Sequence, residues 1–277
     1  MPVRTEVLMG TIVTIQVVRD DEGASGAIER AFGWFREIEA RCTRFDADSE
    51  LMQTCARAGV ATRVSPIVFE AVRFALAVAE DTGGAFDPVT DRTPAAGRPS
   101  RPGKRANFHD VEIDPDSQTI TLRSPLTIDL GAVAKGLAVD AAARELQSFR
   151  NFAIDAGGDL YLGGRNSDGA PWSVGIRHPR DDGRLLDSLR VSDAAVCTSG
   201  DYERPGHIVD PRSAASPAAV ASVTVVASGA MLADALGTAA FVLGPTEGLR
   251  LFERHHVEGL IVTTALERFE TPGVPRS

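Results

Sequence analysis

Hydrophobic and polar residues alternate along the first part of the chain. Between residues 9 and 18, apolar side chains recur at every second position, including Val13, Ile15 and Val17. A period of two places these side chains on one face of an extended backbone, so residues 9–18 are predicted to form a strand. Over residues 27–42 the apolar side chains change to helical spacing. This second stretch is therefore predicted to be an amphipathic helix.

Two further helix starts are marked by the chemistry of single residues. Asp48 or Ser49 can cap a short segment that follows a polar loop. Ser65-Pro66 is a stronger signal, because proline fits the first position of a helix. The helix that begins there is predicted to run to about Asp81 and to end at Gly83-Gly84.

The remaining predicted elements are short strands and two helices near the end of the chain. Strands are expected over residues 111–113, 119–122, 128–130, 152–154, 160–162, 172–176, 185–191, 194–197, 220–226 and 260–264, and helices over residues 231–242 and 246–255. We expect the strand that begins at residue 152 to continue past Gly157-Gly158, with a bulge or a closely approaching ligand at the glycines. Strands outnumber helices and several are consecutive, which favours an α+β fold over a doubly wound sheet. The length and the absence of an internal repeat predict one domain over residues 1–277, with room for two lobes that share a core.

Residues 127–146 combine a short apolar run, a small-residue turn and a helix. A loop that contains Gly131, Lys135 and Gly136 is expected to precede the helix, whose apolar face includes Leu137. Glycine lets the backbone approach a ligand, a helix N-terminus offers free amides, and lysine adds a positive charge. The stretch is therefore a plausible phosphate cradle. A plain connection, with Lys135 paired to an acidic side chain, is the alternative.

The overall charge limits the classes of partner. The formal net charge is −9 at pH 7, which argues against nucleic acid or an anionic membrane as a partner. Serines, Thr224 and Gly229 interrupt the longest apolar region, residues 218–233, so no membrane-spanning segment is expected. The chain enters a strand without a signal segment or a lipidation cysteine, which indicates a cytoplasmic protein. A chain from which an export signal has been removed would look the same.

The three cysteines, Cys42, Cys55 and Cys197, are odd in number and form no CxxC pair. We expect them to be reduced and to pack as small apolar residues.

Candidate chemistry is concentrated on the predicted helix over residues 231–242. Asp234 and Thr238 are four residues apart on an otherwise apolar helix, so their oxygens lie on the same face. Such hard oxygen ligands suit Mg²⁺, which also accepts water and substrate phosphate. The alternative is structural: Asp234 would bond the amides of a neighbouring loop, and Thr238 would bond its own helix.

Three other positions allow more than one interpretation. Residues 198–201 offer two hydroxyls and a glycine after a strand, which suits a ligand loop as well as an ordinary turn. His207, considered alone, is more typical of a structural hydrogen-bonding residue than of a catalytic one. Phe45 lies in a polar loop, where it can stack on an aromatic ligand or anchor the loop in the core.

Taken together and in this order, eight segments resemble the ApbE-type FAD:protein FMN transferases. They are MGTIVTI, TRFDADSEL, TGGAFDP, IDLGAVAKGLAVDAAA, IDAGGDLYLGG, TSGDYE, HIVDPR and ASVTVVASGAMLADALGTAAFVLG, and they extend from Met9 to about Gly244. The resemblance implies a single two-lobed α+β fold of mainly antiparallel and mixed sheets, with FAD held between the lobes. It also implies Mg²⁺-dependent transfer of FMN from FAD to a Thr or Ser hydroxyl of an acceptor protein, with release of AMP.

The resemblance also assigns roles to individual residues. His207 matches the family's histidine near the reacting phosphate and becomes a candidate base or electrostatic partner. The residues that would hold Mg²⁺ are Asp234, Thr238 and the Ala134 carbonyl, with Gly237 beside them. The residues that would line the FAD site are Met9, Phe45, Ala85, Phe86, Asp87, Gly131, Leu137 and Val209.

The chain departs from the family pattern at three positions. Phe45 and Leu137 stand where tyrosine is frequent, which removes two hydroxyls from the expected flavin site. Gly237 stands where some members carry an aspartate beside the metal, which predicts a metal site with fewer charges.

An FAD pyrophosphatase and a non-catalytic FAD-binding protein are the alternative functions. The Arg- and Pro-rich residues 92–105 suggest a loop that covers the ligand or recruits the acceptor.

Overall fold

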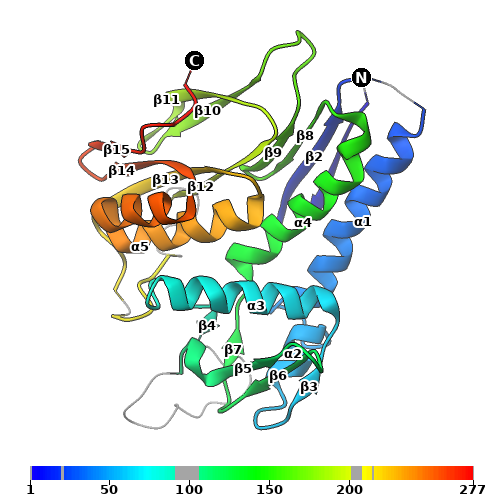
Figure 1. The fold of residues 1–277 in the computed structure, drawn as a ribbon, viewed down its shortest axis with the longest axis vertical. Coiled ribbons are helices and arrows are strands. Elements are labelled where there is room, and N and C mark those ends of the chain that lie inside the picture. Colours follow the sequence, from blue (N-terminus) through cyan, green and yellow to red (C-terminus); the bar gives the residue numbers. More distant parts are fainter. Residues whose placement is uncertain (1, 20–21, 91–105, 201–207, 214, 277) are drawn as a thin grey trace.

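An eight-stranded antiparallel sheet forms the main layer of the protein (Figure 1). The computed structural model describes residues 2–19, 22–90, 106–200, 208–213 and 215–276. In spatial order, the strands of the sheet are β1 (Val3–Leu8), β2 (Thr11–Val17), β8 (Phe152–Ala156), β9 (Asp159–Gly163), β12 (Ala194–Gly200), β13 (Val220–Ala227), β14 (Glu258–Thr263) and β15 (Arg268–Glu270). All of their pairings are antiparallel, which confirms the predicted α+β class.

Three long helices cover one face of this sheet: α1 (Ala24–Cys42), α4 (Gly131–Leu146) and α5 (Ala230–His255) (Figure 1). The alternation of apolar and polar residues in the sequence explains why these helices pack on this face of the sheet. Val13, Ile15 and Val17 of β2 are fully buried, whereas Ile12 of the same strand is 61% exposed. The buried set faces the helices and removes its apolar surface from water.

Below this layer in Figure 1, α3 (Pro66–Asp81) crosses the molecule above a group of smaller elements. These are α2 (Glu50–Cys55), a three-stranded sheet of β3 (Thr62–Arg63), β6 (Thr119–Leu122) and β5 (Val111–Asp114), a two-stranded sheet of β4 (Val89–Thr90) and β7 (Thr127–Ile128), and the 3₁₀ turn Phe108–Asp110. A second 3₁₀ turn, Gln147–Phe149, follows α4. Phe35 of α1, Val72 of α3 and Phe241 of α5 belong to the same buried cluster, so the hydrophobic core is continuous across both parts.

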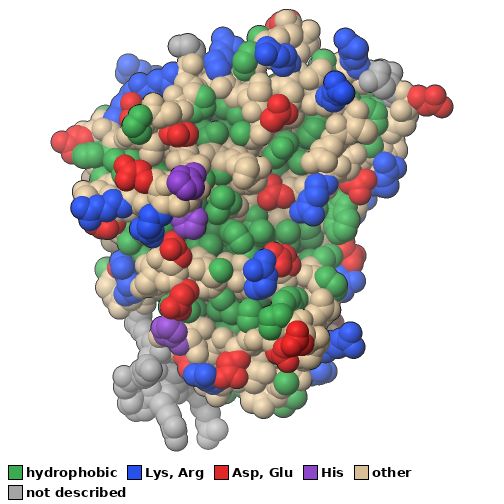
Figure 2. All heavy atoms as spheres, viewed as in Figure 1, with side chains coloured by type: hydrophobic (Ala, Val, Ile, Leu, Met, Phe, Trp, Pro, Cys, Tyr) green, Lys and Arg blue, Asp and Glu red, His purple; other side chains and the backbone are tan. Residues whose placement is uncertain are grey.

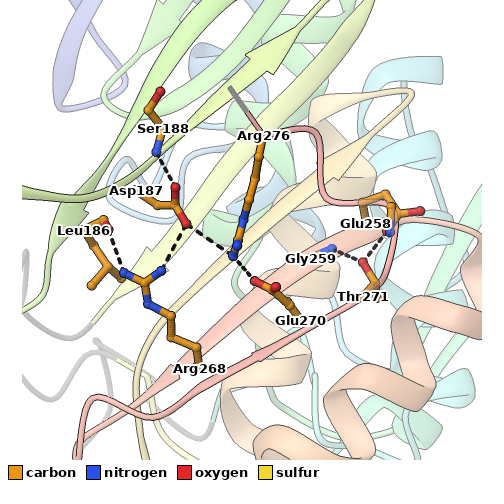
Figure 3. Close-up of polar contacts among 10 residues, drawn as sticks. Leu186, Asp187, Ser188, Glu258, Gly259, Arg268, Glu270, Thr271 and Arg276 are labelled. Atoms are coloured by element: carbon orange, nitrogen blue, oxygen red, sulfur yellow. Dashed lines mark hydrogen bonds and ion pairs between the residues drawn. The ribbon is translucent and has the colours of Figure 1, made fainter.

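The hairpin of β10 (Trp172–His178) and β11 (Asp181–Val191) packs on the other face of the main sheet. A smaller apolar cluster lies beneath it, built from Leu162, Ile176, Leu189, Val191, Val196, Leu260 and Val262. Polar contacts close its edge, where Asp187 of β11 bonds Arg268 of β15 and Arg276 of the C-terminal segment (Figure 3). The sheet is thus covered on both faces over its C-terminal half.

Several boundaries follow the sequence prediction. Ser49 accepts a hydrogen bond from the Met52 amide and caps α2, and Ser65 caps α3 in the same way. Pro66 occupies the first position of α3, and Gly83 and Gly84 follow its end with positive φ angles of 57° and 77°. These local signals determine helix ends because they satisfy backbone groups that have no partner within the helix.

Other boundaries differ from the prediction. Met9 does not begin a strand, because Met9 and Gly10, with φ of 52° and 70°, form the turn between β1 and β2. Gly157-Gly158 does not interrupt one strand but turns the chain between β8 and β9. Both glycines have positive φ, which a tight hairpin turn requires.

Most of the expected loop over residues 131–136 is helical, because α4 begins at Gly131, although the backbone of Ala132 is non-helical, with φ of −94° and ψ of 18°. The two expected C-terminal helices are confirmed as the two parts of α5, which the non-helical backbone of Gly244, with φ of 79°, separates just before Pro245. Thr198, Ser199 and Gly200 extend β12 rather than starting a loop. Residues 92–105, Asp201 and His207 lie outside the described residues.

The cysteines agree with the prediction, since all three are free thiols. Burial raises the pKa of Cys42 to about 12, so this thiol is unreactive at neutral pH. Over the described part of the chain, no helix has the length and apolar character needed to cross a membrane.

Candidate functional site

One end of the main sheet gathers several of the predicted site residues. The register pairs Leu8 with Thr11 and Ala156 with Asp159, so the β1–β2 turn and the β8–β9 turn lie at the same end. Met9 is half-buried in the first of these turns and packs against the core. Antiparallel pairing thereby brings together segments that are about half the chain length apart in the sequence.

A second group is assembled by the pairing of β4 with β7. The Asp129 amide donates to the Pro88 carbonyl at 2.7 Å, which places the segment Ala85–Asp87 beside the start of α4. Ala85 and Phe86 are buried, so their side chains belong to the protein interior rather than to an exposed surface. Asp87 accepts from the amides of Val89 and Phe108, and burial raises the pKa of its carboxyl group.

Asp129 links this group to Phe45. Its carboxylate accepts from the Gly131 amide at 2.9 Å and pairs with Arg44 at 2.9 Å. The Arg44 guanidinium lies 4.5 Å from the centre of the Phe45 ring, which is 84% exposed. Phe45 therefore does not anchor its loop in the core, and its exposed ring makes a cation–π contact with Arg44.

The start of α4 differs from the phosphate cradle that the glycines suggest. The Gly131 amide donates a hydrogen bond to the Asp129 carboxylate, and the amides of Val133 and Ala134 donate to the Leu130 carbonyl. These amides therefore already have partners within the protein. Gly136 serves helix packing, because a Cβ atom there would lie 2.5 Å from the Met231 backbone. Close approach of α4 and α5 is thus the physical reason for this glycine.

The remaining predicted flavin-site residues differ in how exposed their side chains are. Leu137 is buried on α4, whereas Val209 is 41% exposed next to the buried Ile208. Arg212, which follows in the same segment and pairs with Asp210, passes close to Gly84. This contact places residues 208–212 beside the segment that contains Ala85 and Phe86.

Lys135 and two buried aspartates form what we call the lysine–aspartate cluster: Lys135 of α4, Asp159 of β9 and Asp234 of α5. The Lys135 ammonium lies 2.6 Å from Asp159, whose side chain is only 3% exposed. Burial raises the pKa of Asp234 to about 8, and the charge of Asp159 contributes to the rise. Burial alone would lower the pKa of Lys135, but the charges of Asp159 and Asp234 outweigh it and raise that pKa.

The neighbours of this cluster are polar and tightly packed. Cys197 is buried beside Asp159, and burial together with the two aspartate charges raises the pKa of its thiol well above the usual value. A Cβ atom at Gly237 would lie 3.0 Å from the Ser199 hydroxyl, so an aspartate at this position would displace Ser199. Thr238 lies one turn beyond Asp234 and is half-buried.

The donor set at this cluster suits a divalent cation. Burial beside Asp159 favours the protonated form of Asp234, so a cation that bound this carboxyl group would replace its proton. The Asp234 carboxylate, the Thr238 hydroxyl and the Ala134 carbonyl are hard oxygen ligands of the type that Mg²⁺ prefers. Among the described residues no group of three or more His, Cys, Asp or Glu side chains is arranged to hold a metal, so a cation here would also depend on hydroxyl, carbonyl and water oxygens.

A shallow pocket elsewhere on the surface contains none of the predicted residues. Side chains and backbone of α3, α4, α5 and the adjoining strands line it, including Phe74, Asp140 and Leu232. Figure 2 shows apolar side chains gathered across the middle of the face on which these helices meet, with charged side chains of both signs around them. Asp140 is already bonded to the amides of Ala230 and Met231, where it caps α5.

Comparison with known proteins supports the family suggested by the sequence. A sequence model of the ApbE family matches residues 9–261. The chain belongs to the ApbE family. All the predicted site residues, from Met9 to Thr238, lie within the matched region of this ApbE protein.

Individual relatives agree with this placement. The FAD:protein FMN transferase of Vibrio cholerae is 34% identical over 157 residues, a match that covers 52% of this chain and about half, 47%, of that protein. The FAD:protein FMN transferase of Haemophilus influenzae is 27% identical over 85% of this chain and 78% of its own length. The crystal structure of the ApbE protein of Thermotoga maritima superposes with a TM-score of 0.86 at 28% identity, covering 98% of this chain and 97% of that one.

Proposed function

We propose that this ApbE protein transfers FMN from FAD to a Thr or Ser hydroxyl of an acceptor protein and releases AMP, in a reaction that requires Mg²⁺. The relatives above are named for FMN transfer from FAD to protein. The observation that carries the proposal for this chain is the lysine–aspartate cluster. Its Asp234 carboxyl group, with the Thr238 hydroxyl and the Ala134 carbonyl, offers hard oxygen ligands for Mg²⁺. Bound Mg²⁺ would supply the positive charge that phosphoryl transfer needs beside a pyrophosphate.

The reaction exchanges one phosphorus–oxygen bond for another. The acceptor hydroxyl oxygen forms a bond to the phosphorus of the FMN half, and the bond between that phosphorus and the bridging oxygen breaks. AMP leaves with the bridging oxygen, and the hydroxyl proton passes to a base. His207 is the candidate base, by its match to the family motif, and it lies outside the described residues.

The chain's own residues would bind and orient the two substrates. Asp234, Thr238 and the Ala134 carbonyl would hold Mg²⁺, with Gly237 beside them. Bound Mg²⁺ would neutralise charge that develops on the phosphate oxygens. Phe45 would stack on the flavin, while Met9, Ala85, Phe86, Asp87, Gly131, Leu137 and Val209 would line its site.

The test is a count of products with purified protein, FAD and Mg²⁺, with and without an acceptor that carries a flavinylation-type Thr. AMP is quantified, and flavin fluorescence is followed on a denaturing gel. Transfer predicts AMP mainly when acceptor is present, together with fluorescence on the acceptor band. AMP and free FMN without acceptor would indicate a pyrophosphatase, and bound FAD without AMP a flavin-binding protein. Either result would contradict the proposal.

Asp234→Asn tests the metal site within the same assay. We expect turnover to fall by roughly 100-fold, the scale of losing one electrostatic stabiliser of the transition state. Asp168→Asn is the matched control, because Asp168 is an exposed residue in the turn between β9 and β10. Unchanged turnover in Asp234→Asn would remove this residue from the metal site.

A further inference from the structure

Strand β1 forms a free edge of the main sheet. It pairs with β2 on one side, and no described strand lies on its other side. The Val17 amide of β2 donates to the Pro2 carbonyl at 3.0 Å, and in an antiparallel pair such bonds recur at every second residue. The backbone groups of Val3, Thr5 and Val7 therefore point away from β2. They form a row of donors and acceptors that another strand can pair with.

The side chains of these three residues lie on the face of the sheet opposite to α1. Val3 is 46% exposed and Val7 is 77% exposed, and Val7 is paired with Ile12 of β2, which is also exposed. The Thr5 hydroxyl bonds the Thr14 hydroxyl of β2 at 3.1 Å. An exposed apolar strip along a free edge is typical of a surface that binds another chain.

Arg4 and Glu6 lie on the other face, where they contact α1. Arg4 pairs with Glu29 at 2.7 Å, and Glu6 pairs with Arg36 at 2.7 Å. The side chain of Arg4 is 42% exposed and that of Glu6 is 24% exposed, so both charges are accessible at the edge. Charges on an edge strand oppose pairing when like charges face each other, and they favour it when opposite charges do.

The order of residues along β1 decides which charges would meet. Val3-Arg4-Thr5-Glu6-Val7 is symmetric about Thr5 in its apolar positions and antisymmetric in its charges. In an antiparallel pair of two copies centred on Thr5, each valine faces a valine and each arginine faces a glutamate. The free backbone groups also face one another in this register, as antiparallel hydrogen bonding requires. The two neighbouring registers place Arg4 opposite Arg4 or Glu6 opposite Glu6, which is unfavourable.

We propose that β1 is an interaction surface for a second copy of this chain, whose own β1 pairs with it in antiparallel register centred on Thr5. A twofold axis relates the copies, so the same surface serves both, and the two main sheets continue as one. The paired segment is short, which makes the interface small and the dimer dependent on concentration. The inference does not depend on the proposed function, and β1 precedes the region that the family model matches.

The test is sedimentation velocity over a wide range of protein concentration, in which the unaltered protein should form dimers as the concentration rises. Arg4→Glu and Glu6→Arg each place like charges opposite each other at both charge pairs. Each variant alone should self-associate roughly 10-fold more weakly or less, because like charges that face each other across an interface are strongly unfavourable. An equal mixture of the two variants should recover the dimer, because every charge then faces an opposite one.

Two further variants complete the design, with thermal unfolding recorded for each. Thr5→Pro removes the amide at the centre of the proposed pair, and it keeps the bonds to β2 because that amide points away from β2. We expect this variant to lose the dimer. Glu247→Arg is the matched control, because it makes the same change of charge in an exposed ion pair of α5. It should dimerise as the unaltered protein does.

Three results would overturn the inference: a monomer at every concentration, a dimer of unchanged stability in Thr5→Pro, or no recovery when the charge variants are mixed. Recovery on mixing separates pairing across the axis from a structural effect, since each variant chain is the same before and after mixing. If either charge variant does not fold, Thr5→Pro decides alone.

Discussion

Glu50 connects three helices through one carboxylate. It accepts from the Ser65 hydroxyl at 2.7 Å and from the Ser65 amide, and it pairs with Arg41 at 2.9 Å. Burial would raise the pKa of Glu50, but the bonds from Ser65 and Arg41 outweigh burial and lower it. The folded state therefore prefers the charged form, and this preference stabilises the fold wherever the carboxylate is ionised.

Replacement of this residue, Glu50→Gln, should cost about 2 kcal/mol in the free energy of unfolding at pH 7, the scale of hydrogen bonds to a charged group. A lowered folded-state pKa means that the contribution is complete above the unfolded-state pKa near 4.5 and is lost as pH falls through the folded value. Urea unfolding at pH 7 and pH 3 measures this, and the difference should shrink at pH 3. Glu247→Gln, which breaks an exposed pair with Arg250, is the control, and an equal loss there would contradict the interpretation.

At the scale of elements, the crossing of α4 and α5 positions the candidate metal ligands. Gly136 allows the two backbones to approach, and Asp140 of α4 bonds the Ala230 and Met231 amides at 2.6 and 3.1 Å. These bonds satisfy free groups at the start of α5. The crossing therefore fixes the position of Asp234, one turn further along α5, relative to Lys135 and Ala134.

Gly136→Ala should destabilise the protein by about 2 kcal/mol or more, because the added methyl group meets rigid backbone rather than a movable side chain. Gly33→Ala in α1 is the matched control, since no atom lies within 4 Å of its added Cβ. That control should stabilise by up to about 1 kcal/mol through helix propensity. Thermal unfolding measures both variants. Equal effects at the two positions would contradict close packing at the crossing.

At the scale of the whole molecule, the C-terminal segment closes the second apolar cluster. The Arg190 amide donates to the Pro275 carbonyl at 2.8 Å, and Arg276 pairs with Asp187 and Glu270 (Figure 3). Val274 packs against the cluster beneath β10 and β11. This segment therefore connects the hairpin to the main sheet.

A chain that ends at Thr271 should keep the main core but lose protection in the hairpin. We expect the local free energy of opening of β10 and β11 to fall by roughly 2 kcal/mol, from the lost apolar burial and backbone pairing. Hydrogen exchange followed by mass spectrometry measures this, with α3 as the internal reference. Equal deprotection of α3 and the hairpin would show that the segment stabilises the whole fold rather than the hairpin alone.

The sequence by itself determined the features that depend on neighbouring residues. The limits of α3 follow from Ser65, Pro66 and the glycines after Asp81, and the buried face of β2 follows from alternation. The exposed position of Phe45 was left open by the sequence, because a loop phenylalanine suits both a core anchor and a stacking surface. The family was also recognisable, since its motifs are short local strings.

Only the tertiary structure decided which distant residues meet. The glycines before Asp159 resemble a bulge within a strand until the register shows a hairpin turn, and the partner of Lys135 becomes known only when α4 lies over β9. Gly136 appeared to be part of a phosphate loop, whereas its role is set by the backbone of α5. The reason is physical: backbone propensity and capping act within a few residues, while ion pairing, burial and close packing depend on segments that folding brings together from far apart.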